Sequence, residues 1–123
     1  MSIMNAVGVV GEAAPPKVVY VTMAAGASAA VAKAGTATLS NVSSSASNGT
    51  LLASNADRIG VLVFNDSTAV LYLKYGTTAS SSSYSVKMEP GSYWEMPQPI
   101  FTGQIDGIWA SANGAARVTE LEA

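Results

Sequence analysis

The sequence predicts a mostly β fold: a small antiparallel sandwich or barrel of jelly-roll type, preceded by an extended, low-complexity N-terminal arm. Short runs rich in β-branched and aromatic residues recur through the second half of the chain. Clusters of Asn, Asp, Gly, Pro and Ser, which favour turns, separate these runs. The first half consists largely of Ala, Ser, Gly and Thr. We therefore expect an arm over residues 1–50 and a compact β-domain over residues 51–123.

The arm contains one predicted strand. Residues 17–23, Lys-Val-Val-Tyr-Val-Thr-Met, are β-branched and aromatic, and the pair Pro15–Pro16 excludes a helix just before them. Residues 24–34 are rich enough in alanine for a short helix, although glycines interrupt the run. Residues 40–49 are polar and serine-rich, which indicates a loop. Because this composition buries little apolar area, we expect the arm to gain its order from a partner.

The β-domain begins with a predicted pair of strands. Ile59–Asn65 is a continuous apolar run, typical of a strand that is buried on both faces. Val70–Tyr75 alternates two sets of side chains, and the intervening residues Asn65–Thr68 form a turn cluster. We expect these two strands to pair as a hairpin.

Four further strands are predicted, over residues 84–88, 93–96, 105–112 and 115–121. Pro90 and Gly91 fit the central positions of a type II turn between the first two. Asn113 and Gly114 indicate a tight hairpin between the last two. The side chains expected in the core are Leu62, Phe64, Leu71, Leu73, either Ile108 or Trp109, and Val118.

Composition excludes several classes of function. The chain has no histidine and no cysteine, so the commonest general base, the commonest metal ligand and thiol chemistry are all missing. The net charge of −2 and the lack of any basic run argue against nucleic-acid binding. No basic segment precedes the first apolar residues, and the uncharged stretch 34–56 is too polar to enter a bilayer, so we expect no membrane association. Charged residues make up only 11% of the chain, which suggests a surface covered by neighbouring subunits.

The remaining candidates for chemistry are weak. Asp66 and Asp106 are the carboxylates considered for acid–base work, but each lies where Asp serves turn geometry. The serines at 80–83 have Lys74 and Lys87 nearby, yet nothing marks a buried, neutral lysine. We expect no catalytic residue, no cofactor site and no metal site, and hence no enzyme.

Six aromatic residues allow two interpretations. They are Tyr72, Tyr75, Tyr84, Tyr93, Trp94 and Trp109. We expect most of them to fill the core and the half-buried strand faces. The alternative is a platform that stacks on sugar rings, but Tyr93 and Trp94 are neighbours on one strand and so point to opposite faces.

The second half of the chain resembles a known group of proteins. The segments "NDSTAVLYLKYG", "PGSYWEMP", "FTGQIDGIW" and "ANGAARVTE", within residues 51–120, resemble a small β-domain found in structural proteins of tailed bacteriophages. Proteins with that domain are head decoration, head-fibre or tail accessory components. The resemblance implies a location in the virion, with assembly in the host cytoplasm, and brings no catalytic residue with it.

These observations lead to one expected function and two alternatives. We expect a capsid decoration, or cement, protein that binds the assembled shell through its arm and its β-domain. Its partners would be the major capsid protein or other virion structural proteins, and we expect a homo-oligomer, with a trimer favoured. The first alternative is a tail, baseplate or fibre-base component. The second is a glycan- or receptor-binding module on the virion surface.

Overall fold

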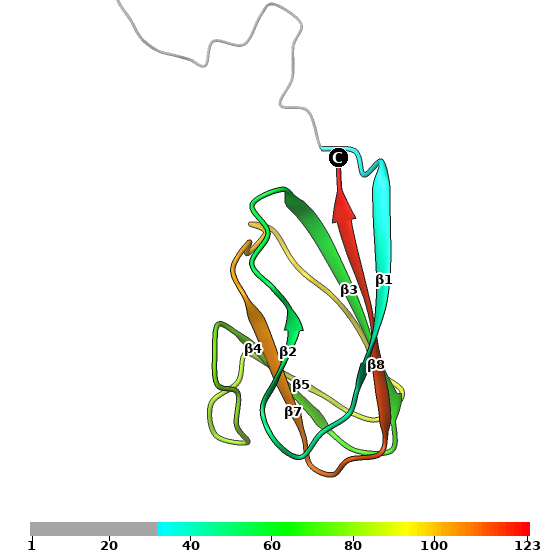
Figure 1. The fold of residues 1–123 in the computed structure, drawn as a ribbon, viewed down its shortest axis with the longest axis vertical. Helices are drawn as coiled ribbons and strands as arrows, with labels where there is room; N and C mark the ends of the chain where they lie inside the picture. The colour runs from blue at the N-terminus through cyan, green and yellow to red at the C-terminus, as the bar shows by residue number, and fades with distance from the viewer. Residues whose placement is uncertain (1–31) are drawn as a thin grey trace, which may run out of the picture. The chain divides into compact units, whose positions relative to one another are not determined.

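The computed structural model describes residues 32–123, and this part of the chain contains eight strands joined by loops and turns (Figure 1). They are β1 Thr36–Ser43, β2 Gly49–Leu52, β3 Arg58–Ser67, β4 Leu71–Tyr75, β5 Val86–Met88, β6 Tyr93–Glu95, β7 Ile105–Trp109 and β8 Gly114–Glu122. The strands form two antiparallel sheets of four. Sheet A has the order β1-β8-β3-β6, and sheet B has the order β2-β7-β4-β5.

The pairing follows the path of a jelly roll. The first strand pairs with the eighth, the second with the seventh, the third with the sixth and the fourth with the fifth. One long antiparallel ribbon, rolled so that its pairs alternate between two sheets, produces this order. The expected mostly β sandwich of jelly-roll type is confirmed.

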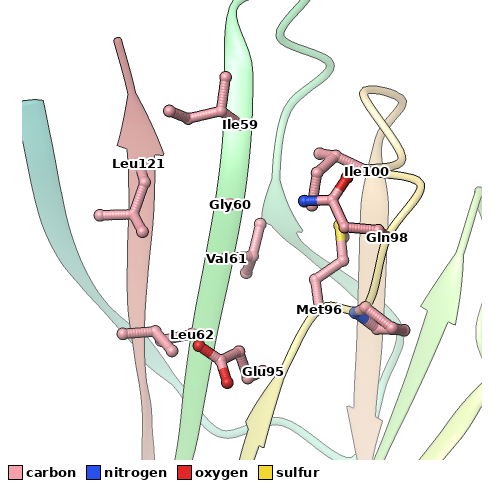
Figure 2. A pocket seen from close by; sticks show the side chains of 10 residues that line it. Ile59, Gly60, Val61, Leu62, Glu95, Met96, Gln98, Ile100 and Leu121 are labelled. Atoms are coloured by element: carbon pink, nitrogen blue, oxygen red, sulfur yellow. The ribbon is translucent and has the colours of Figure 1, made fainter. Parts of the chain in front are cut away.

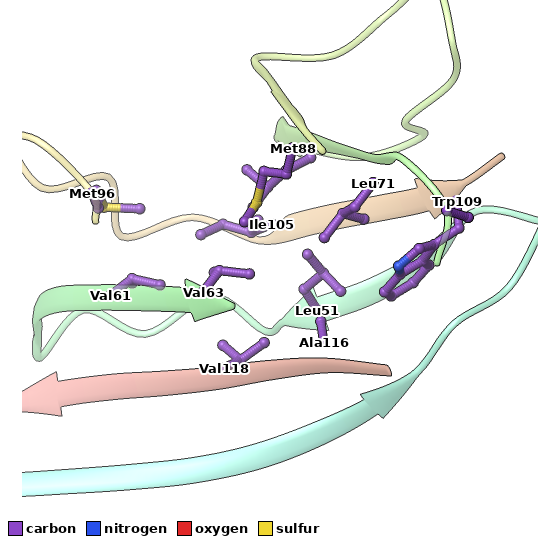
Figure 3. Close-up of a cluster of buried hydrophobic side chains, with 12 residues drawn as sticks. Leu51, Val61, Val63, Leu71, Met88, Met96, Ile105, Trp109, Ala116 and Val118 are labelled. Atoms are coloured by element: carbon purple, nitrogen blue, oxygen red, sulfur yellow. The ribbon is translucent and has the colours of Figure 1, made fainter. Parts of the chain in front are cut away.

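The core lies between the two sheets (Figure 3). Leu71, Leu73 and Val118 are completely buried and Trp109 is 3% exposed, as the sequence predicted. Gly107 makes room for this packing, because a Cβ there would lie 2.9 Å from Leu51 Cδ1. The other buried hydrophobic residues of the core are Leu51, Val61, Val63, Ala69, Met88, Met96, Ile105 and Ala116.

Strand β3 is buried on one face only. Val61 and Val63 point into the core, whereas Leu62 is partly exposed and Phe64 is 40% exposed. The prediction that Leu62 and Phe64 belong to the core is therefore wrong, as is the prediction of burial on both faces. A continuous apolar run does not reveal whether a second layer covers the strand. Within residues 32–123, no element covers this side of sheet A.

The predicted hairpins are corners between the sheets. The cluster after Asn65 leads from β3 in sheet A to β4 in sheet B, and Asn113–Gly114 leads from β7 in sheet B to β8 in sheet A. Both hairpin predictions are wrong, because the strands on either side of each turn lie in different sheets and do not pair with each other. A chain that changes sheets reverses as sharply as a hairpin, so the turn residues alone do not separate the two cases. The turn at Glu89–Ser92 has the expected geometry: the Ser92 N–H donates to the Glu89 carbonyl at 3.0 Å, and Gly91 has φ 77°. It likewise joins strands of different sheets, β5 and β6.

The boundary predicted at residue 50 is also wrong. Strand β1 pairs with β8 over its full length, and β2 pairs with β7, so residues 36–52 belong to the sandwich. Backbone hydrogen bonds, rather than apolar burial, hold β1, which explains why its composition resembled an arm. The predicted strand at 17–23 lies outside the described residues, as does the rest of the arm up to residue 31.

Candidate functional site

The outer face of sheet A carries apolar side chains from β1, β3 and β6, of which Phe64 and Tyr93 lie directly beside each other. The strand register places Leu39, Thr119, Leu62 and Glu95 in one row across the sheet. It places Asn41, Arg117, Phe64 and Tyr93 in the next row. All of these side chains point away from the core, because the residues beside them in each strand, such as Val63 and Val118, point inward.

This face holds three of the four large hydrophobic residues that are exposed in the described part of the chain. Leu39 is 62% exposed, Tyr93 58% and Phe64 40%. The fourth, Tyr84, is 42% exposed and packs against Tyr72, with ring centroids 4.9 Å apart and ring planes tilted by 56°. Single exposed hydrophobic residues are ordinary, but a contiguous group of them marks a surface that another molecule covers.

The charges on this face nearly cancel. Arg117 and Asp66 form a salt bridge of 2.8 Å, and both side chains are nearly half exposed. An ion pair this exposed contributes little to stability, about 0–1 kcal/mol. Its effect is to leave Glu95 as the unmatched charge of the two rows. A partner of this face therefore meets mostly neutral surface.

A pocket of about 470 Å³ adjoins one end of the face (Figure 2). The pocket opens where the pairing of β3 with β6 ends. The last residue pair of the two strands is at Leu62, and beyond it the Met96 N–H donates to the Val61 carbonyl at 3.0 Å. Leu121 leans over Gly60, and a Cβ at that glycine would lie 3.0 Å from Leu121 Cδ1. The lining residues are Ile59, Gly60, Val61, Leu62, Glu95, Met96, Pro97, Gln98, Ile100 and Leu121.

The outer face of sheet B is covered only in part by the chain itself, because a pocket of about 410 Å³ remains beside Tyr72 and Ile108. Asp106 lies on that face but is only 1% exposed, because the segment after β4 folds over it. Its carboxylate accepts hydrogen bonds from the Thr78 N–H at 2.8 Å, from Gln104 Nε2 at 2.8 Å and from Asn48 Nδ2 at 3.0 Å. Burial alone would raise the pKa of Asp106, but these hydrogen bonds outweigh it and lower the pKa. The carboxylate fixes the covering loop in place.

A second buried polar side chain, Asn65, ties the two sheets together. Its amide nitrogen donates to the carbonyls of Ala69, Met88 and Glu89 at 2.9–3.2 Å. Its amide oxygen accepts the indole N–H of Trp109 at 3.2 Å and the Ser67 hydroxyl at 2.7 Å. The one sequence signal for this anchoring role is that Asn65 stands at the end of an apolar run. The sequence analysis instead placed Asn65 in a turn.

Arg58 forms a third anchor, at the opposite end of β3. Its guanidinium, which is fully buried, donates to Glu120 Oε2 at 2.8 Å. It also donates to the carbonyls of Ala53, Phe101 and Gly103 at 2.7–2.9 Å. A buried charge with this many partners ties the loops at this end of the sandwich together. No feature of the sequence separated Arg58 from the exposed basic residues.

The two candidate catalytic carboxylates lie on opposite outer faces. Asp66 is on β3 in sheet A and pairs with Arg117, whereas Asp106 is on β7 in sheet B and is saturated with hydrogen bonds. The structure does not bring them together. It does place Lys74 Nζ 2.7 Å from Ser83 Oγ, in the serine-rich loop, but the same ammonium also donates to the Thr78 carbonyl at 3.3 Å. These bonds hold the loop against β4.

The aromatic residues follow the expected division between faces. Trp94 is partly buried against the core, with its ring 6.0 Å from that of Tyr75, while its neighbour Tyr93 points outward. Tyr75 stacks on Phe101 at 5.1 Å, and burial raises the pKa of Tyr75.

Residues 32–123 contain no cluster of three or more acidic side chains that could hold a metal ion. The same part of the chain has no helix long and apolar enough to cross a bilayer.

Comparison with protein-family models, with curated proteins and with solved structures finds no match for this chain.

Proposed function

We propose that this protein is a non-enzymatic structural component of a bacteriophage particle that attaches to the assembled capsid shell. The attachment uses the outer face of sheet A. The observation that carries the proposal is the pair of rows containing Leu39, Leu62, Phe64 and Tyr93, on a face of sheet A that no other described element covers.

The chemistry of this face fits a large protein partner. A flat sheet surface offers area for contact, and exposed aromatic residues are the side chains that most often dominate protein interfaces. The salt bridge between Arg117 and Asp66 removes most of the local charge, so contact with a neutral protein surface carries little desolvation cost. Attachment of this kind should persist at high salt, since few charge pairs would be screened.

Two arguments point to a virion. The first is the resemblance of residues 51–120 to the β-domain of phage structural proteins. The second is the jelly-roll topology, which viral capsid domains share with lectins and cupins. Topology supports this only by analogy, because one fold serves many functions. The decoration role is chosen over a tail or fibre-base role because a sandwich with one apolar face suits attachment to an extended shell.

The test compares variants of this face with a matched control. Capsids are prepared from the phage that carries this gene after the gene has been deleted, and purified protein is added back. The face variants are Tyr93→Ser and Phe64→Ser. The control is Tyr84→Ser, which removes a comparably exposed ring from the loop that packs on the other sheet. Occupancy is measured by quantitative gel of washed particles, and shell stability by the temperature at which the genome is released.

The wild-type chain and the Tyr84 variant should saturate the shell and raise its disruption temperature. Each face variant should bind at least about tenfold more weakly, the effect of losing one central interface side chain. Equal binding by all four proteins would reject the face as the contact. If the wild-type protein ignored capsids and bound purified tails, the tail-component alternative would replace the proposal. Binding to a glycan array that is lost in Tyr93→Ser would favour the glycan-binding alternative.

A further inference from the structure

Strand β1 forms one edge of sheet A (Figure 1) and is long and regular. It runs for eight residues, and its register with β8 contains no bulge. Just beyond it, the Ser44 N–H donates to the Gly114 carbonyl at 3.0 Å, so the even-numbered residues of β1 form the bonded pairs with β8. The odd-numbered residues, which include Ala37, Leu39 and Asn41, therefore direct their N–H and C=O groups to the open side. Among residues 32–123, no strand pairs with that side.

The other three sheet edges are protected in ways that β1 is not. Strand β6 has three residues, ends at Glu95 and is followed closely by Pro97, and β5 has three residues that include Lys87. Strand β2 has four residues and an irregular register beside β7. Short strands, charges, prolines and bulges all hinder the pairing of an edge with another strand. Strand β1, Thr-Ala-Thr-Leu-Ser-Asn-Val-Ser, has none of them.

The first half of β1 is exposed on both faces of the sheet. Its four residues, Thr36, Ala37, Thr38 and Leu39, are all exposed, and the two threonines among them face the same way as the core residues. Leu39 is the most exposed large hydrophobic residue in the described part of the chain, at 62%. A strand added to this edge would gain hydrogen bonds along its length and apolar contact at Leu39.

We propose that this edge binds β1 of a second copy of the chain, paired antiparallel about a twofold axis at Leu39. Leu39 then lies opposite Leu39 of the second copy, so the two most exposed leucines cover each other. Thr38 lies opposite Ser40, and Ala37 opposite Asn41. The outward N–H and C=O groups of the two strands form about six new hydrogen bonds in this register.

The composition of β1 suits pairing with itself. The strand contains no charged residue, so no like charges meet across the axis. The same pairing at the edges β5 and β6 would bring Lys87 or Glu95 close to its own copy. A twofold contact requires only one surface that is complementary to itself, and dimers of this symmetry are the commonest homo-oligomers.

The pairing would join the two copies of sheet A into one continuous sheet, with four strands from each chain. A twofold axis between antiparallel strands is perpendicular to the sheet, so both outer faces point the same way. The dimer itself does not depend on the proposed attachment to a shell. Where that attachment holds, the second face of the dimer binds at a high effective concentration once the first is bound.

Sedimentation equilibrium of the full-length chain tests the dimer without any capsid. Leu39→Lys places two ammonium groups opposite each other at the axis, and Asn41→Pro removes an outward N–H without removing a bond to β8. The matched control is Tyr93→Lys, which makes the same change of charge at a similarly exposed position on the opposite edge of the same face. Urea unfolding verifies that each variant is folded. The wild-type chain and the control should sediment as two chains, and both β1 variants should dimerise at least about tenfold more weakly.

Disulfide trapping tests the register, because the chain has no cysteine of its own. Leu39→Cys should form an interchain disulfide in a yield on the order of tenfold above Tyr93→Cys, since crosslinking requires Cα atoms within about 7 Å. Asn41→Cys alone should not exceed the control, because the two copies of residue 41 lie about 13 Å apart along the strands. An equal mixture of Ala37→Cys and Asn41→Cys should link again, since these residues lie opposite each other.

Three results would overturn the proposal. The first is a wild-type chain that sediments as one chain at every concentration; a Leu39→Cys thiol that then resisted labelling would identify another segment of the same chain as the cover of the edge. The second is a mass of three chains, because a twofold contact between two edges closes at two. The third is an equal yield of disulfide from Leu39→Cys and Asn41→Cys, which would indicate random collision. Failure of the protein to bind capsids would leave all three measurements unchanged and would count only against the proposed function.

Discussion

Replacing Asn65 with alanine should destabilise the sandwich strongly, although the change removes only a few polar atoms. Asn65 is completely buried and joins β3 to carbonyl groups at one end of the β4–β5 pair, where Leu71 lies opposite Met88. A polar group left unsatisfied in the interior costs about 1–3 kcal/mol. The size of the effect therefore depends on which partners have other bonds to fall back on.

The structure allows these partners to be counted. The Ala69 carbonyl can accept the single Ser67 hydroxyl proton that Asn65 Oδ1 no longer takes, and the Glu89 carbonyl keeps the Ser92 N–H. The indole N–H of Trp109 loses the acceptor it has in the structure, and the Met88 carbonyl loses one donor. The indole N–H is left without a partner, the Met88 carbonyl has one donor fewer, and the shorter side chain leaves a small cavity. Asn65→Ala should therefore lower the free energy of unfolding by about 2–4 kcal/mol. This is a large share of the 5–15 kcal/mol that stabilises a typical domain.

Urea unfolding followed by tryptophan fluorescence measures this loss. With a slope of about 2 kcal/mol per molar urea, the midpoint should fall by about 1–2 M at an unchanged slope. Asn41→Ala is the control, because Asn41 is exposed on β1 and should change stability by less than about 0.5 kcal/mol. If the two variants unfolded at the same urea concentration, the reasoning about Asn65 would be refuted.

Asn65→Asp sharpens the test without changing the shape of the side chain. A carboxylate cannot donate to the three carbonyls, so the charged form is disfavoured in the folded state and its pKa there should lie above the unfolded value. The penalty should then be small in acid and grow as the pH rises. A variant as stable as wild type at neutral pH would contradict the assigned hydrogen bonds.

Three further outcomes are expected from the same unfolding assay. Leu71→Ala should cost about 2–5 kcal/mol, and Phe64→Ala less than about 1.5 kcal/mol because its ring is partly exposed; equal losses would contradict the assigned faces of the strands. Gly114→Ala should cost more than Gly91→Ala: both positions have positive φ, but only at Gly114 would a Cβ meet backbone, 2.4 Å from a carbonyl oxygen. The pKa of Asp106 is lowered in the folded state, so the ionised carboxylate stabilises the fold above the unfolded pKa, and this stabilisation is lost on acidification. Asp106→Asn should therefore flatten the fall in the free energy of unfolding between about pH 5 and about pH 2. An unchanged pH profile would reject the role given to the Asp106 carboxylate.

The strands of the second half were predictable because their signal is local. Runs such as Val70–Tyr75 carry β-branched and aromatic residues with a period of two, and turn residues flank them. The pairing was not predictable in the same way. Asn113–Gly114 specifies a reversal of the chain, but the reversal alone does not say whether the next strand joins the same sheet or crosses to the other one. That choice depends on contacts distant in sequence, such as the packing of Gly114 against the end of β3.

Strand β1 and the buried polar residues could not be predicted from the sequence for a different reason. Sequence patterns detect apolar burial, and β1 is held by hydrogen bonds to β8 with little burial of its own. Arg58 and Asp106 are buried charged residues, and most of their hydrogen-bond partners lie on segments distant in sequence. Nothing in the local sequence distinguishes such residues from solvent-exposed charges. The sites that order the loops were therefore the least predictable part of the structure.

The difference between the two outer faces is the strongest reason to regard sheet A as the functional surface. On sheet B, hydrogen bonds to the buried Asp106 carboxylate and from Lys74 hold the loop from residue 76 to residue 85 over part of the strands. On sheet A the rows containing Phe64 and Tyr93 receive no such cover from the described residues. The side chains of the polar anchors Arg58, Asn65 and Asp106 all point away from this face, so the side chains of the two rows take no part in the anchoring hydrogen bonds. Substitutions there should consequently change attachment while leaving the stability of the sandwich almost unaltered, which allows the two properties to be measured separately.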